Sequence, residues 1–199
     1  MIITERIKAK KEEKKNSLLN TAFKLFLDKG IQNTSIDDIT KNSRIAKGTF
    51  YLYFKDKYEI QEELIVRESK KLFDNALLKA NTKKFKTIAD ELIFIIDDVI
   101  EKLTKNKILL KFISKNLSWG VYNEKLNKIA INNSLNLEKT FMQRIKKYNV
   151  KLKNPKVTLY MITELSGSTL FSSILYGKPL PIKRYKPYLY DEIRKMLNN

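Results

Sequence analysis

The residues of this chain best suited to chemistry lie between Arg44 and Lys57. The segment Lys47-Gly48-Thr49-Phe50-Tyr51-Leu52-Tyr53-Phe54 combines an ammonium group, a glycine, a hydroxyl and two phenols. Phe50 and Phe54 are one helical turn apart and can face inward, which leaves the polar side chains to the other faces. Ammonium, hydroxyl and phenol groups on one short helix are suited to the phosphates and base edges of DNA.

The preceding residues predict the elements that would position this helix. Thr34 or Ser35 can cap a short helix, and Ser35 and Asp38 have the spacing of a capping box. Asn42, Ser43 and Arg44 then interrupt the apolar pattern, as turn residues do. Two short helices joined by a tight turn predict a helix-turn-helix, a motif whose second helix enters the major groove.

A longer helix is predicted ahead of this motif. Residues 12–29 have a helical apolar period, and Gly30 is suited to the left-handed position that ends a helix. Residues 1–11 are basic and are expected to be poorly ordered. They can be read as a solvated tail or as an arm that reaches DNA.

At these residues the chain resembles the TetR family of bacterial transcription regulators. The positions that carry the resemblance are Leu19, Ala22, Phe23, Leu25, Phe26, Gly30, Thr34, Ser35, Ile39, Lys47, Gly48, Thr49, Phe50, Tyr51, Tyr53, Phe54 and Lys57. The resemblance implies an all-α fold. In it, a three-helix DNA-binding domain over residues 1–57 precedes a helical effector-binding and dimerisation domain over residues 58–199.

The expected DNA contacts follow from this resemblance and from the chemistry of the side chains. The residues expected to contact DNA are Thr34, Ser35, Arg44, Lys47, Gly48, Thr49, Tyr51, Tyr53 and Lys57. Arg44 and Ala46 depart from the family pattern, which commonly has glycine in the turn and serine at the start of the recognition helix. Alanine cannot cap a helix, so one phosphate contact is expected to be lost and Arg44 could replace it.

The rest of the chain is predicted to form further helices, over residues 57–78, 85–103, 108–113, 123–147, 155–176 and 186–197. Residues 119–122 suggest a corner. Pro155 favours the first position of a helix, and Gly177 favours the end of that helix.

The resemblance also implies an effector pocket and a dimer interface. For each pocket candidate, ordinary core is the alternative that the residue type favours, and Glu164 could meet a cationic ligand, a lysine or a second subunit. The pocket candidates are Phe94, Phe112, Trp119, Tyr122, Phe141, Tyr160, Met161, Glu164 and Phe171. The dimer candidates are Gly167, Ser168, Phe171, Ser172, Leu175, Leu189 and Ile193.

Composition narrows the function classes. The chain has no cysteine and no histidine, which removes disulfides, thiolate and histidine metal sites and Ser-His-Asp triads. No combination of acid, base and nucleophile suggests an enzyme, and no cofactor or metal is expected. The formal charge of +18 suggests a polyanionic partner. It does not locate the contact, because residues 1–57 (13 basic, 7 acidic) and residues 58–199 (27 basic, 15 acidic) are both basic.

No apolar run reaches the roughly 18 to 20 residues of a membrane span, and no signal peptide is evident, so a cytoplasmic protein is expected. The resemblance to the TetR family implies a ligand-responsive, homodimeric repressor that binds a palindromic operator in double-stranded DNA and is released by a small-molecule effector. The alternatives are a non-specific structural DNA-binding protein without an effector and a protein that binds lipid surfaces. The sequence leaves open the effector, the operator, the direction of regulation and the role of the N-terminal residues.

Overall fold

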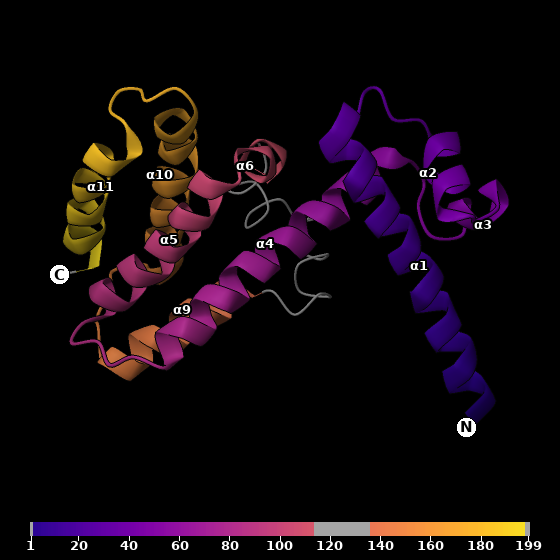
Figure 1. Cartoon of the computed structure of the whole chain (residues 1–199). Helices are drawn as coiled ribbons and strands as arrows, with labels where there is room; N and C mark the ends of the chain where they lie inside the picture. The colour runs from indigo at the N-terminus through magenta and orange to yellow at the C-terminus, as the bar shows by residue number, and fades with distance from the viewer. Residues whose placement is uncertain (1, 114–135, 198–199) are drawn as a thin grey trace. The chain divides into compact units, whose positions relative to one another are not determined.

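The computed structural model describes residues 2–113 and 136–197 of this 199-residue chain, and the regular secondary structure of these residues is all α-helix (Figure 1). The predicted all-α fold is confirmed. The helices are α1 (Ile2–Lys29), α2 (Ile36–Ser43), α3 (Lys47–Tyr51), α4 (Lys57–Asn81), α5 (Ile88–Lys105), α6 (Lys107–Ile113), α9 (Leu137–Tyr148), α10 (Pro155–Leu175) and α11 (Ile182–Leu197).

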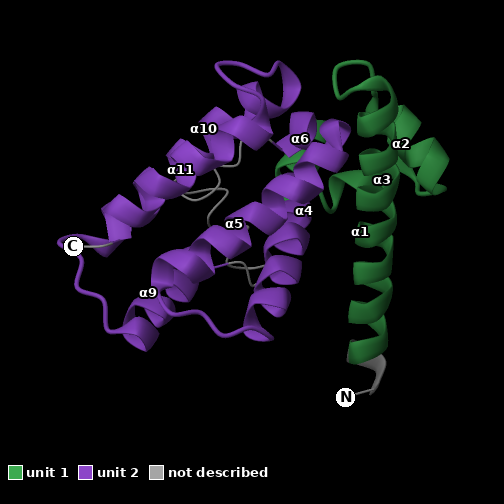
Figure 2. Cartoon of the chain, turned by 60° about the vertical axis from the view of Figure 1, so that its left-hand side comes forward, with its two compact units in different colours: residues 1–64 green, residues 65–199 purple. Residues whose placement is uncertain are grey.

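The chain forms two compact units, Met1–Leu64 and Ile65–Asn199 (Figure 2). The division falls inside α4, whereas the sequence predicts a domain boundary at the start of this helix. Ile60 and Leu64 explain the difference, because both are fully buried and belong to the first unit. The first two turns of α4 are therefore part of the core of that unit.

In the first unit, α1 buries one apolar face. Leu18, Leu19, Ala22 and Phe26 on this face are buried, and Gly30 ends the helix with a φ of 79°, as predicted. The predicted start at residue 12 was wrong, because α1 already begins at Ile2 and residues 5–14 are exposed helix. This stretch is rich in Lys and Glu and contains no glycine or proline, so nothing in it stops the helix.

The second unit has a core formed by α5, α10 and α11 together with α6, α9 and the second part of α4. A polar cluster adds to the contact between α5 and α11. Lys186 Nζ lies 2.6 Å from Asp97 Oδ1 and also pairs with Glu101, while the hydroxyl of Tyr190 donates to Asp97. Burial and this hydrogen bond raise the pKa of Tyr190, so the phenol stays protonated.

Local capping signals set most helix ends in this unit. Thr87 Oγ1 accepts from Asp90 N at 3.1 Å at the start of α5, and Asn154 caps α10, with Pro155 in the predicted first position. α11 begins at Ile182, before the predicted residue 186, because the carbonyl of Pro181 already accepts hydrogen bonds from Arg184 N and Tyr185 N. The predicted helix over 123–147 and the corner at 119–122 lie partly or wholly outside the described residues.

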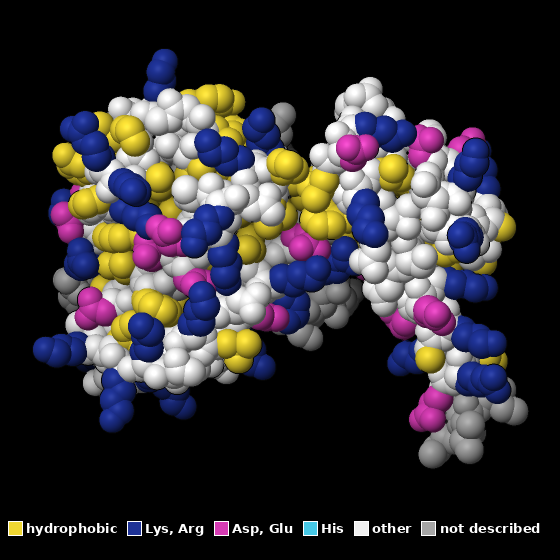
Figure 3. Space-filling model, viewed as in Figure 1, with side chains coloured by type: hydrophobic (Ala, Val, Ile, Leu, Met, Phe, Trp, Pro, Cys, Tyr) yellow, Lys and Arg dark blue, Asp and Glu magenta, His cyan; other side chains and the backbone are white. Residues whose placement is uncertain are grey.

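Surface charge does not single out one region. Lys and Arg side chains are scattered over both units on the face shown in Figure 3. None of the described helices combines the length and the apolar composition of a membrane span. The described residues also contain no acidic cluster that could hold a metal ion.

Candidate nucleic-acid interface and effector cavity

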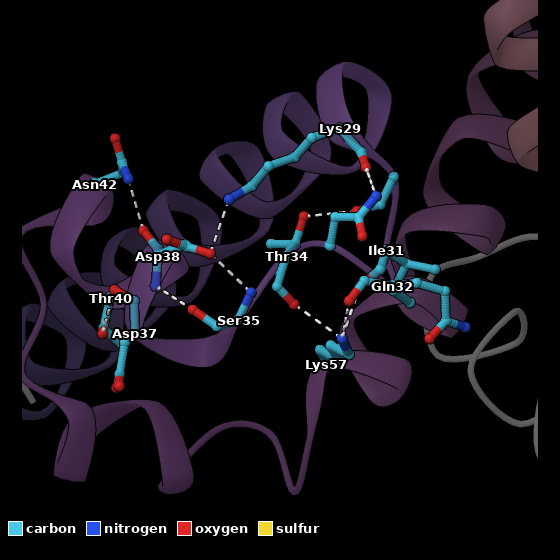
Figure 4. A network of polar contacts seen from close by, with 12 residues as sticks. Lys29, Ile31, Gln32, Thr34, Ser35, Asp37, Asp38, Thr40, Asn42 and Lys57 are labelled. Atoms are coloured by element: carbon cyan, nitrogen blue, oxygen red, sulfur yellow. Dashed lines mark hydrogen bonds and ion pairs between the residues drawn. The ribbon is translucent and has the colours of Figure 1, made fainter.

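The start of α2 is fixed by the predicted capping box (Figure 4). Ser35 Oγ accepts from Asp38 N at 3.0 Å, and Asp38 Oδ2 accepts from Ser35 N at 2.8 Å. Lys29 Nζ, at the end of α1, donates to the same carboxylate oxygen at 2.8 Å. The hydrogen bonds from Lys29 and Ser35 hold the pKa of Asp38 well below its usual range. The orientation of α2 is thereby linked to the end of α1.

Thr34 and Lys57 have structural partners inside the first unit (Figure 4). Thr34 is buried, with its hydroxyl donating to Gly30 O at 2.8 Å and its amide to Ile31 O at 3.3 Å. Lys57 Nζ donates to the carbonyl oxygens of Ile31, Gln32 and Thr34 at 2.8, 3.1 and 2.9 Å. Sequence reasoning placed both residues at a phosphate, whereas the structure uses their polar groups to hold the α1–α2 loop against the start of α4. Asp56 caps α4 by accepting from Tyr58 N and Glu59 N.

The turn between α2 and α3 is closed by Arg44 in a left-handed conformation, with a φ of 56°. Ile45 N donates to Thr40 O and Arg44 N to Lys41 O, the hydrogen-bond pair of a Schellman motif. Glycine adopts this backbone conformation at the lowest cost, which accounts for the glycine that the family commonly has at this position. The Arg44 side chain is exposed.

The helix α3 follows the predicted division into buried and exposed faces. Phe50 and Phe54 are buried, while Lys47, Gly48 and Tyr51 are exposed. Thr49 and Tyr53 are half-buried. Ala46 stands at the N-cap and makes no side-chain cap, as predicted. The exposed side of α3 therefore presents the polar side chains of the segment.

Two features of α3 bear on its function. Lys47 Nζ lies 2.7 Å from Asp37 Oδ1 of α2, and both side chains are largely exposed. At Gly48, a Cβ atom would have no protein atom within 4 Å, and the residue has no left-handed φ. Glycine inside a helix lowers stability, so the packing and backbone of this chain give no reason for glycine at this position.

The second unit contains a cavity of about 110 Å³ between α4, α5, α9 and α10. Most of its lining is aliphatic or aromatic, and Arg144 is the one charged side chain among the described residues that line it. The lining residues are Phe73, Leu77, Leu92, Ile95, Ile96, Val99, Leu103, Leu137, Thr140, Phe141, Arg144, Leu159, Ile162, Thr163, Ser166, Gly167 and Leu170.

Of the predicted pocket residues, Phe141 lines this cavity. Tyr160 and Met161 are exposed instead, and Phe94, Phe112, Glu164 and Phe171 are half-buried outside the lining. Trp119 and Tyr122 lie outside the described residues. Sequence reasoning missed Arg144 and the α5 residues, because an apolar helical period predicts burial but cannot show where packing leaves a space.

Arg144 belongs to a polar cluster beside the cavity. Its Nε lies 3.2 Å from Oε1 of Glu91, which is 1% exposed, and Lys147 Nζ and Tyr148 Oη lie 2.7 and 2.6 Å from Oε2. Burial raises the pKa of the Glu91 carboxyl, but the hydrogen bonds from Lys147 and Tyr148 and the charge of Arg144 outweigh it. The net effect lowers this pKa, so Glu91 is ionised at neutral pH.

The predicted dimer residues fall into different environments. Leu189 and Ile193 are 1% and 0% exposed within the single chain, so their assignment to a subunit interface was wrong; they pack into the core of the second unit. Gly167 lines the cavity, and Ser168 is exposed. Phe171, Ser172 and Leu175 are half-buried.

The fold defines a helix-turn-helix protein with a separate helical unit that holds an apolar cavity. Residues 18–64 match the family profile described as "Bacterial regulatory proteins, tetR family". The chain is 46% identical over 46 residues to YuxN, an uncharacterized HTH-type transcriptional regulator of Bacillus subtilis, covering 23% of this chain and 16% of that relative. The helix-turn-helix segment of the chain, residues 18–64, is therefore that of the TetR family.

Similarity beyond the helix-turn-helix is lower. IcaR, the negative transcriptional regulator of the icaADBC biofilm operon of Staphylococcus aureus, is 28% identical over 116 residues, covering 55% of this chain and 60% of that relative. The chain therefore spans less than two thirds of the curated relatives it matches. The crystal structure of the transcriptional regulator FadR from Bacillus subtilis in complex with stearoyl-CoA has the same fold. The two structures align with a TM-score of 0.62 and 18% sequence identity, and the alignment covers 89% of this chain and 96% of that chain.

Proposed function

We propose that this protein is a sequence-specific DNA-binding transcription regulator that acts as a homodimeric repressor and is released from a palindromic operator by a small-molecule effector. The exposed polar side of α3, in the segment that matches the TetR family, carries this proposal. An N-terminal helix-turn-helix domain and a helical effector domain, divided near the start of α4, would share these tasks.

The DNA contacts divide by chemistry. Lys47 and Thr49 offer an ammonium, a hydroxyl and a methyl group to base edges, and Tyr51 and Tyr53 offer phenols to phosphates. Gly48 lets the DNA approach the backbone, which accounts for a glycine that the fold itself does not need. Arg44 and Ser35 would contact the flanking phosphates. Thr34 and Lys57 would act indirectly, by holding α2 through the hydrogen bonds of Figure 4.

The dimer is proposed to form through the outer side of α10. Val157, Tyr160 and Met161 on this helix are 43–49% exposed, although each is apolar or aromatic. Helical spacing continues this side through Ser168, Ser172 and Leu175. A helix that is apolar on both sides and buried on only one is suited to a second subunit. A two-fold dimer would present two recognition helices to the two halves of a palindrome.

The apolar cavity is the proposed effector site. FadR of Bacillus subtilis, which shares the fold, has been crystallised with stearoyl-CoA, and IcaR is named as a negative regulator. An effector would release DNA by binding more tightly to a conformation in which the recognition helices do not fit successive major grooves. The helix α4 begins in the first unit and continues into the second, so it would transmit this change.

The relatives named above are transcription regulators rather than enzymes, and we infer the same for this chain, acting in the cytoplasm. The competing function is a non-specific structural DNA-binding protein. Its support is the formal charge of +18 and the spread of basic side chains over both units.

Selection of binding sites from a random DNA library separates the two functions. The proposed function predicts enrichment of one palindromic sequence by the purified protein, and loss of that enrichment with Lys47→Ala. A library that stays random after several rounds, while the protein retains its DNA at low salt, would support the structural DNA-binding protein instead.

A further inference from the structure

The cavity of the second unit has a one-sided polarity. The helices α4 and α5 contribute only apolar side chains to it, whereas its polar residues, Thr140, Arg144, Thr163 and Ser166, all come from α9 and α10. An apolar pocket with a few polar groups on one wall is typical of a site for a small organic ligand of fixed orientation.

Charge at one end of the cavity favours an anion. Glu91 provides one negative charge, and Arg144 and Lys147 provide two positive charges around it. The Lys147 side chain is 56% exposed, so solvent screens its charge. The Arg144 side chain is only 13% exposed, so its charge is screened less. Arg144 Nε lies close to Glu91 Oε1, but the geometry between the two atoms is not that of a hydrogen bond. A guanidinium has five N–H donors, so Arg144 can bind a second carboxylate without being rebuilt.

A buried hydroxyl also points to a ligand. Ser166 Oγ is buried, on a residue that is 8% exposed, and it makes no hydrogen bond within the described part of the chain. Buried polar groups are usually satisfied, so this hydroxyl lacks a partner that a ligand oxygen or a water would supply.

The lining also indicates an elongated ligand. On α5 it runs from Leu92, next to Glu91, to Leu103, and the eleven helical steps between these two residues rise about 16 Å. The ion pair of Glu91 and Arg144 marks the Leu92 end. The remaining length is apolar on its α4 and α5 sides, as a hydrocarbon chain requires.

We propose that the cavity binds an amphipathic carboxylate with an extended aliphatic chain, whose head group pairs with Arg144 and whose chain runs along α5 toward Leu103. Glu91 then competes with the ligand for Arg144. This inference rests on the proposed function only in treating the cavity as the effector site.

Calorimetric titration with three probes of equal chain length tests this proposal. Octanoate, octan-1-ol and octylammonium each have eight carbons and carry an anionic, a neutral and a cationic head group, respectively. We expect octanoate to bind about tenfold tighter than octan-1-ol, and octylammonium to bind most weakly. Benzoate, a compact acid, should bind more weakly than octanoate. Equal affinity for octanoate and octan-1-ol, or a preference for benzoate, would overturn the proposal.

Variants assign the effect to Arg144. Arg144→Met should reduce octanoate binding to the level of octan-1-ol, whereas Arg144→Lys should keep most of the preference. Glu91→Gln should tighten octanoate binding several-fold, because the competing carboxylate is gone. Exposed Arg184 supplies the matched control, since Arg184→Met should change nothing. If Arg144→Met does not fold, Arg144→Lys and Glu91→Gln still test the proposal. An unchanged octanoate affinity in Glu91→Gln would contradict a competition between Glu91 and the ligand for Arg144.

A DNA-release assay separates this inference from the proposed function. Octanoate that binds the protein but leaves a specific DNA complex intact would confirm the ligand class and contradict the effector role. Specific DNA binding by a protein that binds none of the three probes would contradict the inference alone.

Discussion

Lys47 Nζ and Asp37 Oδ1 lie 2.7 Å apart and join the start of α3 to the first turn of α2. The hydrogen bond that Lys47 donates to Asp37 raises the pKa of Lys47, so the ammonium is charged at neutral pH. Both side chains are more than half exposed, so the pair is accessible to a partner. A DNA phosphate or a guanine edge would have to compete with Asp37 for Lys47.

Removal of this competition should strengthen DNA binding. Asp37→Asn removes a negative charge that repels phosphates and frees Lys47, so we expect the Kd for a specific site to fall about three- to tenfold. Lys47→Ala should raise the Kd at least about tenfold and lower the slope of log Kd against log salt by about one. Fluorescence anisotropy over a salt series measures both. If the Asp37→Asn variant binds the specific site no more tightly than the wild-type protein does, Asp37 does not compete with DNA for Lys47.

Gly48→Ala should separate stability from function. The added Cβ meets no protein atom within 4 Å, and alanine favours a helix over glycine, so the free energy of unfolding should rise by up to about 1 kcal/mol. DNA binding should weaken at least about tenfold, because the methyl group would occupy space that the DNA backbone needs. Urea unfolding and anisotropy measure the two quantities. Unchanged DNA affinity would mean that the DNA does not approach this side of α3.

Lys57 should contribute to stability through its three carbonyl partners. Lys57→Met leaves these oxygens without a charged donor, and we expect a loss of about 2 kcal/mol in the free energy of unfolding. Exposed Lys55 is the matched control, and Lys55→Met should cost less than about 0.5 kcal/mol. If the two variants are equally stable and Lys57→Met binds DNA more weakly, Lys57 contacts a DNA phosphate instead of stabilising the fold.

The Glu91 cluster predicts a pH dependence of stability. The pKa of Glu91 is lower in the folded state than its ordinary value near 4.5, so the ionised carboxylate stabilises the fold. This stabilisation is present above about pH 4.5 and is lost as the pH falls below that value. We expect Glu91→Gln to be about 2 kcal/mol less stable than wild type at pH 7. That difference should shrink below about pH 4.5. A difference that stays constant between pH 7 and 3 would show that Glu91 is not ionised in the fold.

Two residues of the predicted dimer interface should now behave differently. Ser168→Glu places a charge on the exposed side of α10 and should weaken dimerisation at least about tenfold without unfolding the chain. Leu189→Ala opens a cavity in the core and should cost about 2 to 5 kcal/mol of stability, while the folded fraction remains dimeric. Sedimentation equilibrium and thermal unfolding distinguish the two. Intact dimers of Ser168→Glu would place the interface on another surface.

Local signals made much of the fold predictable. The capping box of Ser35 and Asp38, the start of α10 at Pro155 and the helix end at Gly30 each depend on neighbouring residues, so sequence spacing was sufficient. The inward-facing pair Phe50 and Phe54 likewise followed from helical periodicity. The start of α1 was missed because an exposed, charged helix has no apolar period to mark its beginning.

Roles that depend on tertiary contacts could not be predicted. Lys57 meets carbonyl groups more than twenty residues away, and Glu91 meets Lys147 across 56 positions, so spacing could not pair them. Leu189 and Ile193 were expected at a subunit interface, and they are buried within the single chain instead. Periodicity could not distinguish burial in the same chain from burial against a second subunit, because both require the same apolar side.

The specificity ratio of DNA binding tests the central claim most directly. The Kd of the purified protein for the selected palindrome and for the same bases in scrambled order would be measured at physiological salt, with Lys47→Ala as the control. We expect at least about a thousandfold preference for the palindrome, with one dimer per site, and a smaller preference for Lys47→Ala. Equal Kd values for the two DNAs, both rising steeply with salt and unaffected by Lys47→Ala, would contradict the claim.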